Sequence, residues 1–331
     1  MLDLRRLRLL RELDRRGTIA AVAEALAYTA SAVSQQLSVL EREAGVPLLE
    51  RSGRRVALTP AGRTLVTHAD AVLERLELAV SELAGAREGI GGPLRIGTFP
   101  SGGPAIVPAT LAELARQHPA LEPMVQEIDS ARVSDGLRAG ELDVALVHDY
   151  DFVPASPDTT VDQVPLLEEP MYLATATATA TATAPEPAPD TDPDTDTGPD
   201  TDSAEDLTAR DGTLADLLGP WATAPWITAR DGTTGHAMAV RACQAAGFQP
   251  RIRHQVNDFR TVLALAAIGQ GAGFVPEMAT AHAPEHVVLT PLPLYRRSKV
   301  AFRAGGGAHP AIAAFVTAAR TAIAATAPHA P

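Results

Sequence analysis

Several residue types are scarce or unfavourably placed in the sequence, and each scarcity excludes a kind of site or a class of protein. Cys243 is the one cysteine among 331 residues, so an internal disulfide or a thiolate metal cluster is excluded, and a reducing cytoplasm is the expected setting. No run of about 18 uncharged apolar residues occurs, which argues against a membrane span. The first 16 residues carry charges of both signs and lack the apolar centre of a secretory signal peptide. Aromatic residues make up 4%, so Ala, Val and Leu must form most of the cores.

Acidic residues outnumber basic ones, and the net charge of -12 is unevenly distributed. Residues 1–68 carry 11 Arg against 7 Asp or Glu, a balance of +4, which leaves -16 for residues 69–331. Nine acids and no base lie in the Thr-, Pro- and Asp-rich segment 174–206, which predicts a disordered low-complexity insertion. The basic excess at the N-terminus suits a phosphate-binding surface and, equally on charge alone, a solvated face.

Three short helices are predicted within the first 64 residues. The first carries an apolar stripe formed by Leu4, Leu7, Leu10 and Leu13. Thr18 is placed to cap a second helix, and Thr29 to cap a third that runs to about Glu43. Only Ala27 and Tyr28 stand between the second and third, and two short helices on a tight turn are typical of a helix-turn-helix.

The third predicted helix has an apolar inner face and a polar outer face. Val33, Leu37 and Leu40 recur at i, i+4 and i+7 and are expected to be buried. The polar residues that could contact bases or phosphates are Thr29, Ser31, Ser34, Gln35, Gln36 and Ser38. A polar surface helix without a DNA-binding role is the alternative interpretation of these residues.

A β-hairpin with a basic tip is predicted after this helix. Gly53 suits a turn, and Val56 and Leu58 alternate as they would in a strand. The candidate phosphate contacts of this wing are Arg51, Arg54 and Arg55.

A long helix is predicted next, with Thr59 and Pro60 as its cap and first residue. Apolar residues recur at spacings of 4-3-4-3-4, namely Leu65, Ala69, Val72, Leu76, Ala79 and Leu83. This heptad seam predicts a homodimer or tetramer, with an amphipathic helix packed on its own domain as the alternative. The helix is expected to end in a hinge at Gly89, Gly91, Gly92 and Pro93.

The same residues resemble those of a known family over some sixty positions. The marks are Ala20-Ala21, Leu26, Ala32-Val33-Ser34, Gln36-Leu37, Leu40-Glu41, Gly45, Leu48, Arg51, Leu58-Thr59 and Ala61-Gly62. At this spacing they resemble the LysR-type transcriptional regulators. There are departures, since the family's usual Ser-Gln-Pro opening of the third helix is Thr29-Ala30-Ser31 here, and its usual Phe before Glu-Arg is Leu49. Further along, Leu94–Thr98 and Gly140–Val147 look like strands of the family's effector domain, and Asp258–Pro276 like its late helix–turn–strand.

The resemblance implies an α/β fold class with three parts. These are an N-terminal all-helical winged helix-turn-helix domain at 1–64, a linker and dimerisation helix at 65–90, and a two-subdomain periplasmic-binding-protein-like effector domain at 91–331. It implies a DNA-binding transcriptional regulator that contacts an interrupted palindromic site on double-stranded DNA through the helix at 29–42. A small-molecule inducer is expected in the cleft of the effector domain, and no enzymatic activity, cofactor or membrane partner is expected. The protein would be cytoplasmic, and on the nucleoid when bound to DNA.

Candidate effector contacts follow from the tendency of open α/β sheets to bind ligands at the carboxyl ends of strands. The residues placed there are Thr98, Ser101, Ser130, Asp149, Arg230 and Phe274. Arg230 could hold a carboxylate through two parallel hydrogen bonds, although turn formation or helix capping is the alternative for each residue. Cys243 is expected to be core packing rather than a nucleophile, and the nine His show no metal-binding spacing.

Two other classes of function remain as alternatives. A metabolic enzyme or solute-binding protein with an N-terminal oligomerisation module would require a catalytic constellation, and the sequence shows none. A structural nucleoid protein would not require an acidic, two-subdomain sensor.

Overall fold

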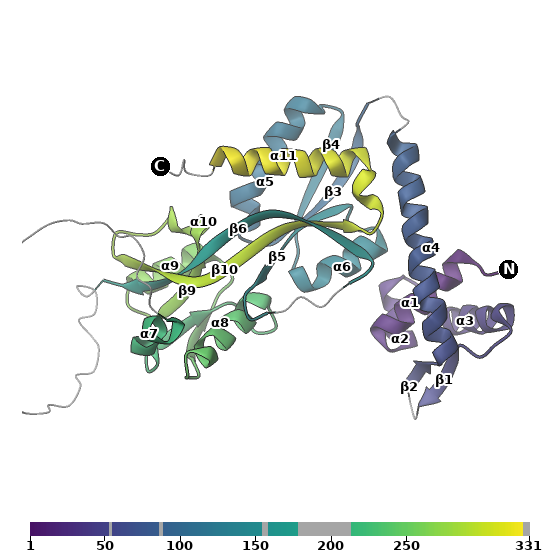
Figure 1. Ribbon diagram of the computed structural model, residues 1–331, viewed down its shortest axis with the longest axis horizontal. Coiled ribbons are helices and arrows are strands. Elements are labelled where there is room, and N and C mark those ends of the chain that lie inside the picture. The colour runs from purple at the N-terminus through teal and green to yellow at the C-terminus, as the bar shows by residue number, and fades with distance from the viewer. Residues whose placement is uncertain (53–54, 86–88, 154–157, 178–212, 327–331) are drawn as a thin grey trace, which may run out of the picture. The chain divides into compact units, whose positions relative to one another are not determined.

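A computed structural model describes residues 1–52, 55–85, 89–153, 158–177 and 213–326 (Figure 1). The chain divides into two compact units. The first unit comprises Met1–His148, Ala155–Leu167 and Arg297–Pro331, and the second comprises Asp149–Pro154 and Glu168–Arg296. Among the described residues, no helix is both long enough and apolar enough to cross a membrane.

The N-terminal part of the first unit consists of α1 (Leu4–Arg16), α2 (Ile19–Ala25), α3 (Ala30–Ala44), β1 (Leu49–Ser52), β2 (Arg55–Leu58) and α4 (Pro60–Gly85). Asp3, Thr18 and Thr29 cap the three short helices, each accepting hydrogen bonds from backbone N–H groups in the first turn. Such a cap stabilises a helix by about 0.5–2 kcal/mol, so these local signals define the helix starts. The caps expected at Thr18 and Thr29 are confirmed.

The core of this part is built from aliphatic side chains. Its buried members are Leu7, Leu9, Leu10, Leu13, Val22, Ala23, Val33, Leu37, Leu40, Leu48, Leu58, Val66 and Ala69. The expected inner face of α3 is confirmed, since Val33, Leu37 and Leu40 are buried. The expected stripe on α1 was wrong at one position. Leu4 is exposed at the first turn, and Leu9 is buried although it lies off the three-residue spacing.

The start of the long helix α4 is confirmed at Pro60 with Thr59 as its cap, so the helix begins before the domain boundary assigned at residue 65. Thr59 Oγ1 accepts the Gly62 N–H at 3.0 Å, which caps a helix that starts at Pro60. A Cβ at Gly62 would lie 2.3 Å from the Leu48 carbonyl oxygen, so the first turn of α4 requires glycine where it passes the backbone just before β1. Gly89 and Gly92 beyond the helix have positive φ, as a change of chain direction there would require.

The α/β part of the first unit contains β3 (Gly92–Thr98), α5 (Gly102–Gln117), β4 (Leu121–Glu127), α6 (Ser130–Ala139), β5 (Val144–Tyr150) and α11 (Pro310–Thr326). Strand β3 pairs in parallel with β4 and with β5. The strand expected at Gly140–Val147 starts later, because Gly140 is the left-handed C-cap of α6 and β5 begins only at Val144.

The second unit contains α7 (Leu214–Leu218), β7 (Pro225–Thr228), α8 (Thr234–Ala245), β8 (Arg251–Gln255), α9 (Phe259–Ala267), β9 (Ala272–Pro276) and α10 (Glu277–Thr280). Strand β7 pairs in parallel with β8 and β9. The helix–turn–strand expected over Asp258–Pro276 is confirmed as α9 and β9, with Asp258 as the N-cap of α9.

Two long strands, β6 (Val161–Ala176) and β10 (Val287–Arg303), continue from one unit into the other. The strand order is β4-β3-β5-β10-β6-β9-β7-β8. The start of the expected insertion at residue 174 was wrong. Ala174 is buried and pairs with Gly273 in the antiparallel β6–β9 ladder, and β6 ends at Ala176. Most of the segment predicted to be disordered falls in residues 178–212, outside the described residues.

Candidate nucleic-acid interface and effector site

The turn between α2 and α3 contains a residue in the left-handed backbone conformation. Ala27 has φ of 55°, a conformation that costs a residue with a side chain about 1–2 kcal/mol. The Tyr28 N–H donates to the Ala23 carbonyl oxygen at 2.8 Å, which offsets part of that cost. The turn therefore brings Thr29 directly into the capping position of α3.

The outer face of α3 is exposed and polar. Thr29, Ser31, Ser34, Gln35 and Ser38 are exposed, as a surface that contacts DNA must be. Some of their hydroxyl groups make local hydrogen bonds, such as Ser38 Oγ to the Ser34 carbonyl oxygen at 3.1 Å. These bonds are within α3 or its cap and leave the face accessible.

Gln36 differs from the rest of this predicted set. Its side chain is half-buried, and its Oε1 accepts a hydrogen bond from Arg6 Nε at 2.9 Å. Arg6 also pairs with Glu43, so Gln36 belongs to a contact between α1 and α3. The flanking position assigned from the sequence therefore lies at the edge of the exposed face.

A two-stranded antiparallel hairpin follows α3, as expected for a wing. Arg51 on β1 pairs with Val56 on β2, and Ser52 pairs with Arg55. Arg54 lies outside the described residues. Glu41 of α3 ties the hairpin to the recognition helix, since its Oε1 accepts the N–H groups of Leu48 and Leu49 at 2.9 and 3.0 Å. Sequence reasoning did not assign this positioning role, because Glu41 reads as an ordinary surface acid.

The heptad seam of α4 divides into two halves. Ala69 is buried and Leu65 packs against the core of the N-terminal part. Val72, Leu76 and Leu83 are exposed, Leu83 by 72%. The start of the helix is thus packed on its own domain, and the later positions present apolar side chains to solvent. Pairing of two chains through those positions stays a prediction.

Three candidate effector residues belong to the first unit. Thr98 ends β3, is buried, and donates from Oγ1 to the Phe99 carbonyl oxygen at 3.2 Å. Ser101 is at the N-cap position of α5 and Ser130 at the first residue of α6. The Ser130 hydroxyl is buried and has no hydrogen-bond partner among the described residues. These residues follow β3 and β4 at the strands' carboxyl ends, as the sequence indicated.

The other three candidates belong to the second unit. Arg230 is exposed, and its N–H donates to Asn257 Oδ1 at 2.9 Å. Asp149 was expected after the strand but lies within β5, which continues to Tyr150. Phe274 was expected at a strand end, but it lies in the middle of β9 and packs in the core with its ring centroid 5.2 Å from that of Trp226.

One histidine near Arg230 was not singled out from the sequence. His236 Nδ1 lies 3.2 Å from the Ala229 carbonyl oxygen and 3.4 Å from Thr228 Oγ1. Its position follows from the Thr233 cap that starts α8 directly after β7. No motif in the sequence marks this histidine as a site residue, because only the turn before α8 brings it close to Thr228 and Ala229.

Cys243 is buried on α8 in the core of the second unit. Burial raises the pKa of its thiol to about 12, so the reactive thiolate form is negligible at neutral pH. Its expected role in core packing agrees with this position.

The N-terminal helix-turn-helix with its wing and the two α/β units define a DNA-binding transcriptional regulator with an effector domain. The chain belongs to the LysR family: residues 4–63 match the bacterial regulatory helix-turn-helix protein model of the lysR family, and residues 87–191 and 204–324 match the LysR substrate binding domain.

Known proteins with similar sequences or folds agree with this membership. The chain is 42% identical over 154 residues to a probable hydrogen peroxide-inducible genes activator of Mycobacterium xenopi, a match that covers 46% of this chain and 79% of the relative. In other curated relatives the match spans about half of their length.

Two solved structures share the fold. A hydrogen-peroxide-bound OxyR mutant of Corynebacterium glutamicum aligns over 98% of this chain and 94% of its own, with 23% identity and a TM-score of 0.55. Full-length CbnR in complex with its target DNA aligns over 97% and 100%, with 22% identity and a TM-score of 0.50.

Proposed function

We propose that the chain is a one-component regulator, and not an enzyme, that reads an interrupted inverted repeat in duplex DNA through the exposed face of α3. The observation that carries this proposal is the division of α3 into a buried aliphatic face and an exposed face of short polar side chains. Gln35 is the central reader, because its amide can hydrogen-bond an adenine edge in the major groove. Arg51, Arg54 and Arg55 contact the phosphate backbone from the wing.

The domain assignment belongs to the same proposal. Residues 1–64 bind DNA, residues 65–90 link and dimerise, and residues 91–331 bind the effector. The exposed apolar residues Val72, Leu76 and Leu83 on α4 support pairing of two chains, in a homodimer or tetramer. Pairing would place two recognition helices in successive major grooves of DNA in the cytoplasm.

The effector is a small molecule. Its candidate contacts are Thr98, Ser101 and Ser130 in the first unit, and Asp149 and Arg230 in the second. The exposure of Arg230 supports an effector that carries a carboxylate, because a guanidinium on the surface can bind a carboxylate through two parallel hydrogen bonds. Phe274 contributes through the packing of β9, since its ring is in the core. His236 joins this set through its position beside the Ala229 carbonyl oxygen.

The relatives named for peroxide-inducible genes raise thiol oxidation as a second way to sense a signal. Two features of Cys243 oppose it in this chain. Disulfide formation within the chain requires a second cysteine, and peroxide oxidises the thiolate rather than the buried, protonated thiol. We therefore expect iodoacetamide to label Cys243 only after unfolding; rapid labelling of the native protein would restore the thiol mechanism.

Fluorescence anisotropy with the DNA upstream of the chain's own gene, against scrambled DNA across a salt series, tests DNA reading. Gln35→Ala should reduce the preference for the specific sequence by about 5- to 150-fold, the loss expected for one bidentate base contact of about 1–3 kcal/mol. Gln244→Ala, the same change at an exposed position of α8, serves as the control. Equal preference in the two variants would remove Gln35 as the reader, and no salt-dependent binding by the unmodified chain would refute the proposal.

A further inference from the structure

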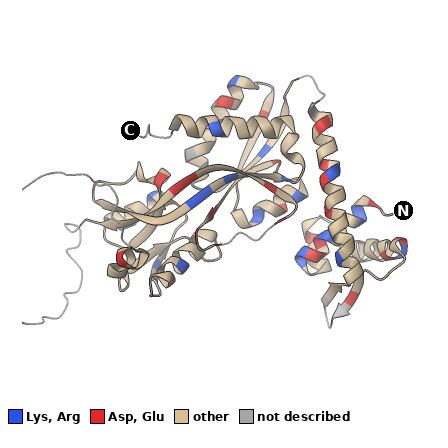
Figure 2. Ribbon diagram, viewed as in Figure 1, with Lys and Arg blue, Asp and Glu red and all other residues tan. Residues whose placement is uncertain are grey.

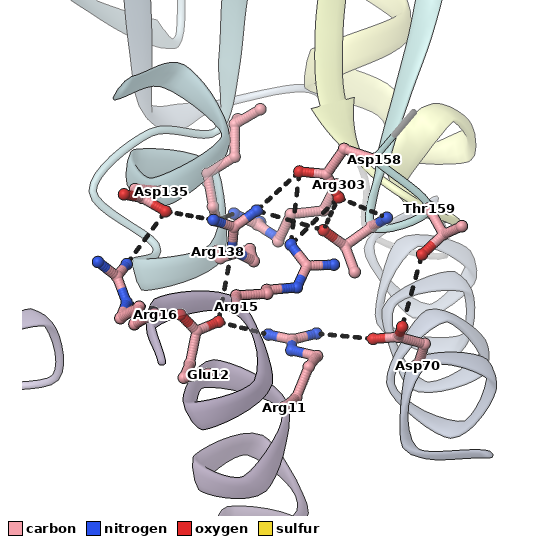
Figure 3. A network of polar contacts seen from close by, with 12 residues as sticks. Arg11, Glu12, Arg15, Arg16, Asp70, Asp135, Arg138, Asp158, Thr159 and Arg303 are labelled. Carbon is pink, nitrogen blue, oxygen red and sulfur yellow. Dashed lines mark hydrogen bonds and ion pairs between the residues drawn. The ribbon is translucent and has the colours of Figure 1, made fainter. Parts of the chain in front are cut away.

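Eight charged side chains of the first unit form a cluster between α1, α4, α6 and the segment 158–160 (Figure 3). We call it the junction network; its members are Arg11, Glu12, Arg15, Arg16, Asp70, Asp135, Arg138 and Asp158. Four arginines face four carboxylates, so the charges balance. Three of the arginines lie on the α1 helix of the DNA-binding part together with Glu12, and Arg138 lies on α6 of the effector part.

Glu12 is the centre of the network and is only 2% exposed. Its Oε2 lies 3.0 Å from Arg16 Nε on the next turn of α1. Its Oε1 lies 3.4 Å from Arg138 Nε, across the boundary between the DNA-binding and effector parts. Burial of this carboxylate against an arginine of the effector part points to a role in contact between the two parts.

Asp158 completes the contact from the effector side. Its carboxylate lies 3.1 Å from Arg15 Nη1 and 2.8 Å from Arg138 Nη1, and it accepts hydrogen bonds from the Thr160 N–H and hydroxyl. Burial alone would raise the pKa of Asp158, but the Thr160 hydrogen bonds and the two arginine charges outweigh it and lower the pKa to about 2. Asp158 is therefore ionised at any physiological pH. Arg16 similarly reaches Asp135 of α6 at 3.0 Å.

Helix α4 contributes a separate attachment beside the network. Arg303 Nε lies 2.9 Å from Glu77 Oε1, and a Cβ at Gly305 would lie 2.6 Å from the Glu74 carbonyl oxygen. On α4, Asp70 Oδ1 lies 3.9 Å from Arg11 Nη1, and Asp70 Oδ2 accepts a hydrogen bond from the Thr159 hydroxyl at 3.5 Å. A cavity of about 210 Å³, lined by Arg8, Leu73, Arg138 and Thr159 among others, lies between these elements. The contact is thus made largely by charged side chains, with a cavity beside them.

The chain itself connects the DNA-binding part to the effector part only through α4 and the glycine-containing segment after it. The junction network joins the same two parts at α1, by contacts between residues more than a hundred positions apart. Docking of α1 leaves Ser34 and Gln35 exposed, so it is compatible with reading DNA.

We propose that the junction network is an intramolecular docking surface, through which the effector domain sets the orientation of its own DNA-binding domain directly at α1 as well as through α4. The docking is ionic, because it is made by charge pairs around the buried acid Glu12. The outer pairs, Arg15 with Asp158 and Arg16 with Asp135, are partly solvated, so we expect the docking to be reversible. The proposed docking fixes the position of α1, so it does not depend on which residues of α3 contact DNA.

Distance measurement by double electron–electron resonance tests this docking in the full chain. Spin labels at Glu24→Cys on α2 and Glu122→Cys on β4, both exposed positions, report the separation of the two parts. Buried Cys243 is replaced by Ala in this background, and labelled chains are diluted with unlabelled chains so that only distances within one chain are recorded. Arg15→Glu is the test variant, since it places two acids together at Asp158. Arg5→Glu makes the same charge change at an exposed position of α1 and is the matched control.

The docked state predicts one narrow distance distribution in the unmodified chain and in Arg5→Glu. Arg15→Glu should lose that distribution, and Arg15→Gln, which removes the charge without adding an acid, should retain part of it. Circular dichroism establishes that each variant is folded. A broad distribution in the unmodified chain, or an unchanged narrow one in Arg15→Glu, would overturn the proposal.

Discussion

The junction network and an ion pair in the second unit are built in different ways. In the second unit, Glu169 on β6 and Arg296 on β10 join neighbouring strands, with Arg296 fully buried and Glu169 2% exposed. Figure 2 marks the positions of basic residues in blue and of acidic residues in red along the ribbon. Glu169 Oε1 accepts from two nitrogens of Arg296 at 2.9 and 2.7 Å, and its Oε2 accepts the Met278 N–H at 2.8 Å. Both carboxylate oxygens are therefore satisfied.

The junction network is less complete. Within the described residues, four of its buried atoms lack a hydrogen bond, namely Arg11 Nε, Glu12 Oε1, Asp70 Oδ1 and Arg138 Nε. Its members come from four separate segments rather than from adjacent strands. A pair that is fully hydrogen-bonded on adjacent strands is part of the sheet, whereas a network with unsatisfied atoms between separate helices can open at a smaller cost.

The largest expected effect separates the strand pair from the network. Arg296→Met should lower the free energy of unfolding by about 3–5 kcal/mol, because it leaves Glu169 charged and buried without its partner. Urea unfolding followed by circular dichroism measures this loss. The double variant Glu169→Gln with Arg296→Met should recover part of it. An equal loss in both variants would show that packing of Arg296, not its charge, is the source of the effect.

Glu12→Gln should have the next largest effect. It should destabilise the first unit by about 1–3 kcal/mol, because Arg11 and Arg138 lose a buried opposite charge. Arg15→Gln at the more exposed edge of the network should cost less than about 1 kcal/mol. Thermal unfolding of the two variants gives the ranking, and the reverse order would mean that Glu12 is not the centre of the network.

The pH dependence of Asp158 provides a smaller test. Because its folded-state pKa of about 2 lies below the ordinary 3.8, ionised Asp158 stabilises the fold above pH 4, and this contribution is lost as the pH falls toward 2. At pH 6, Asp158→Asn should lower the free energy of unfolding by about 1–2 kcal/mol, after allowance for solvent screening. Melting temperatures from pH 6 to pH 2 should converge for the two proteins. A constant difference would contradict the ionic origin.

Asp70 should show the smallest effect, with the opposite sign. Burial raises its pKa by more than Arg15 and Arg11 lower it, so the ionised form is disfavoured in the fold. The favourable contribution of its protonated form is present below pH 4 and is lost as the pH rises through the raised pKa. Asp70→Asn should therefore leave stability at pH 7 unchanged or slightly higher. A clear drop in melting temperature would show that the pair with Arg11 outweighs burial.

The sequence predicted the structure of the DNA-binding part well, because the signals for its helices are local. The caps at Thr18 and Thr29, the spacing of Val33, Leu37 and Leu40, and Pro60 at the start of α4 each act within a few residues. Boundaries that depend on partners elsewhere were less accurate. Ala174 resembles the low-complexity segment after it, yet pairing with β9 makes it part of a strand.

Local pattern thus determined the helices of the DNA-binding part, the face of α3 available to DNA, and membership of the LysR family. Tertiary structure alone decided which charged residues are partners. Glu12, Asp70, Arg138 and Asp158 look like ordinary surface charges in the sequence, and only folding brings them together. Tertiary packing likewise placed Phe274 in a core and Gln36 against Arg6. The physical reason is range: capping and periodicity act between residues a few positions apart, whereas an ion pair depends on where distant segments meet in space.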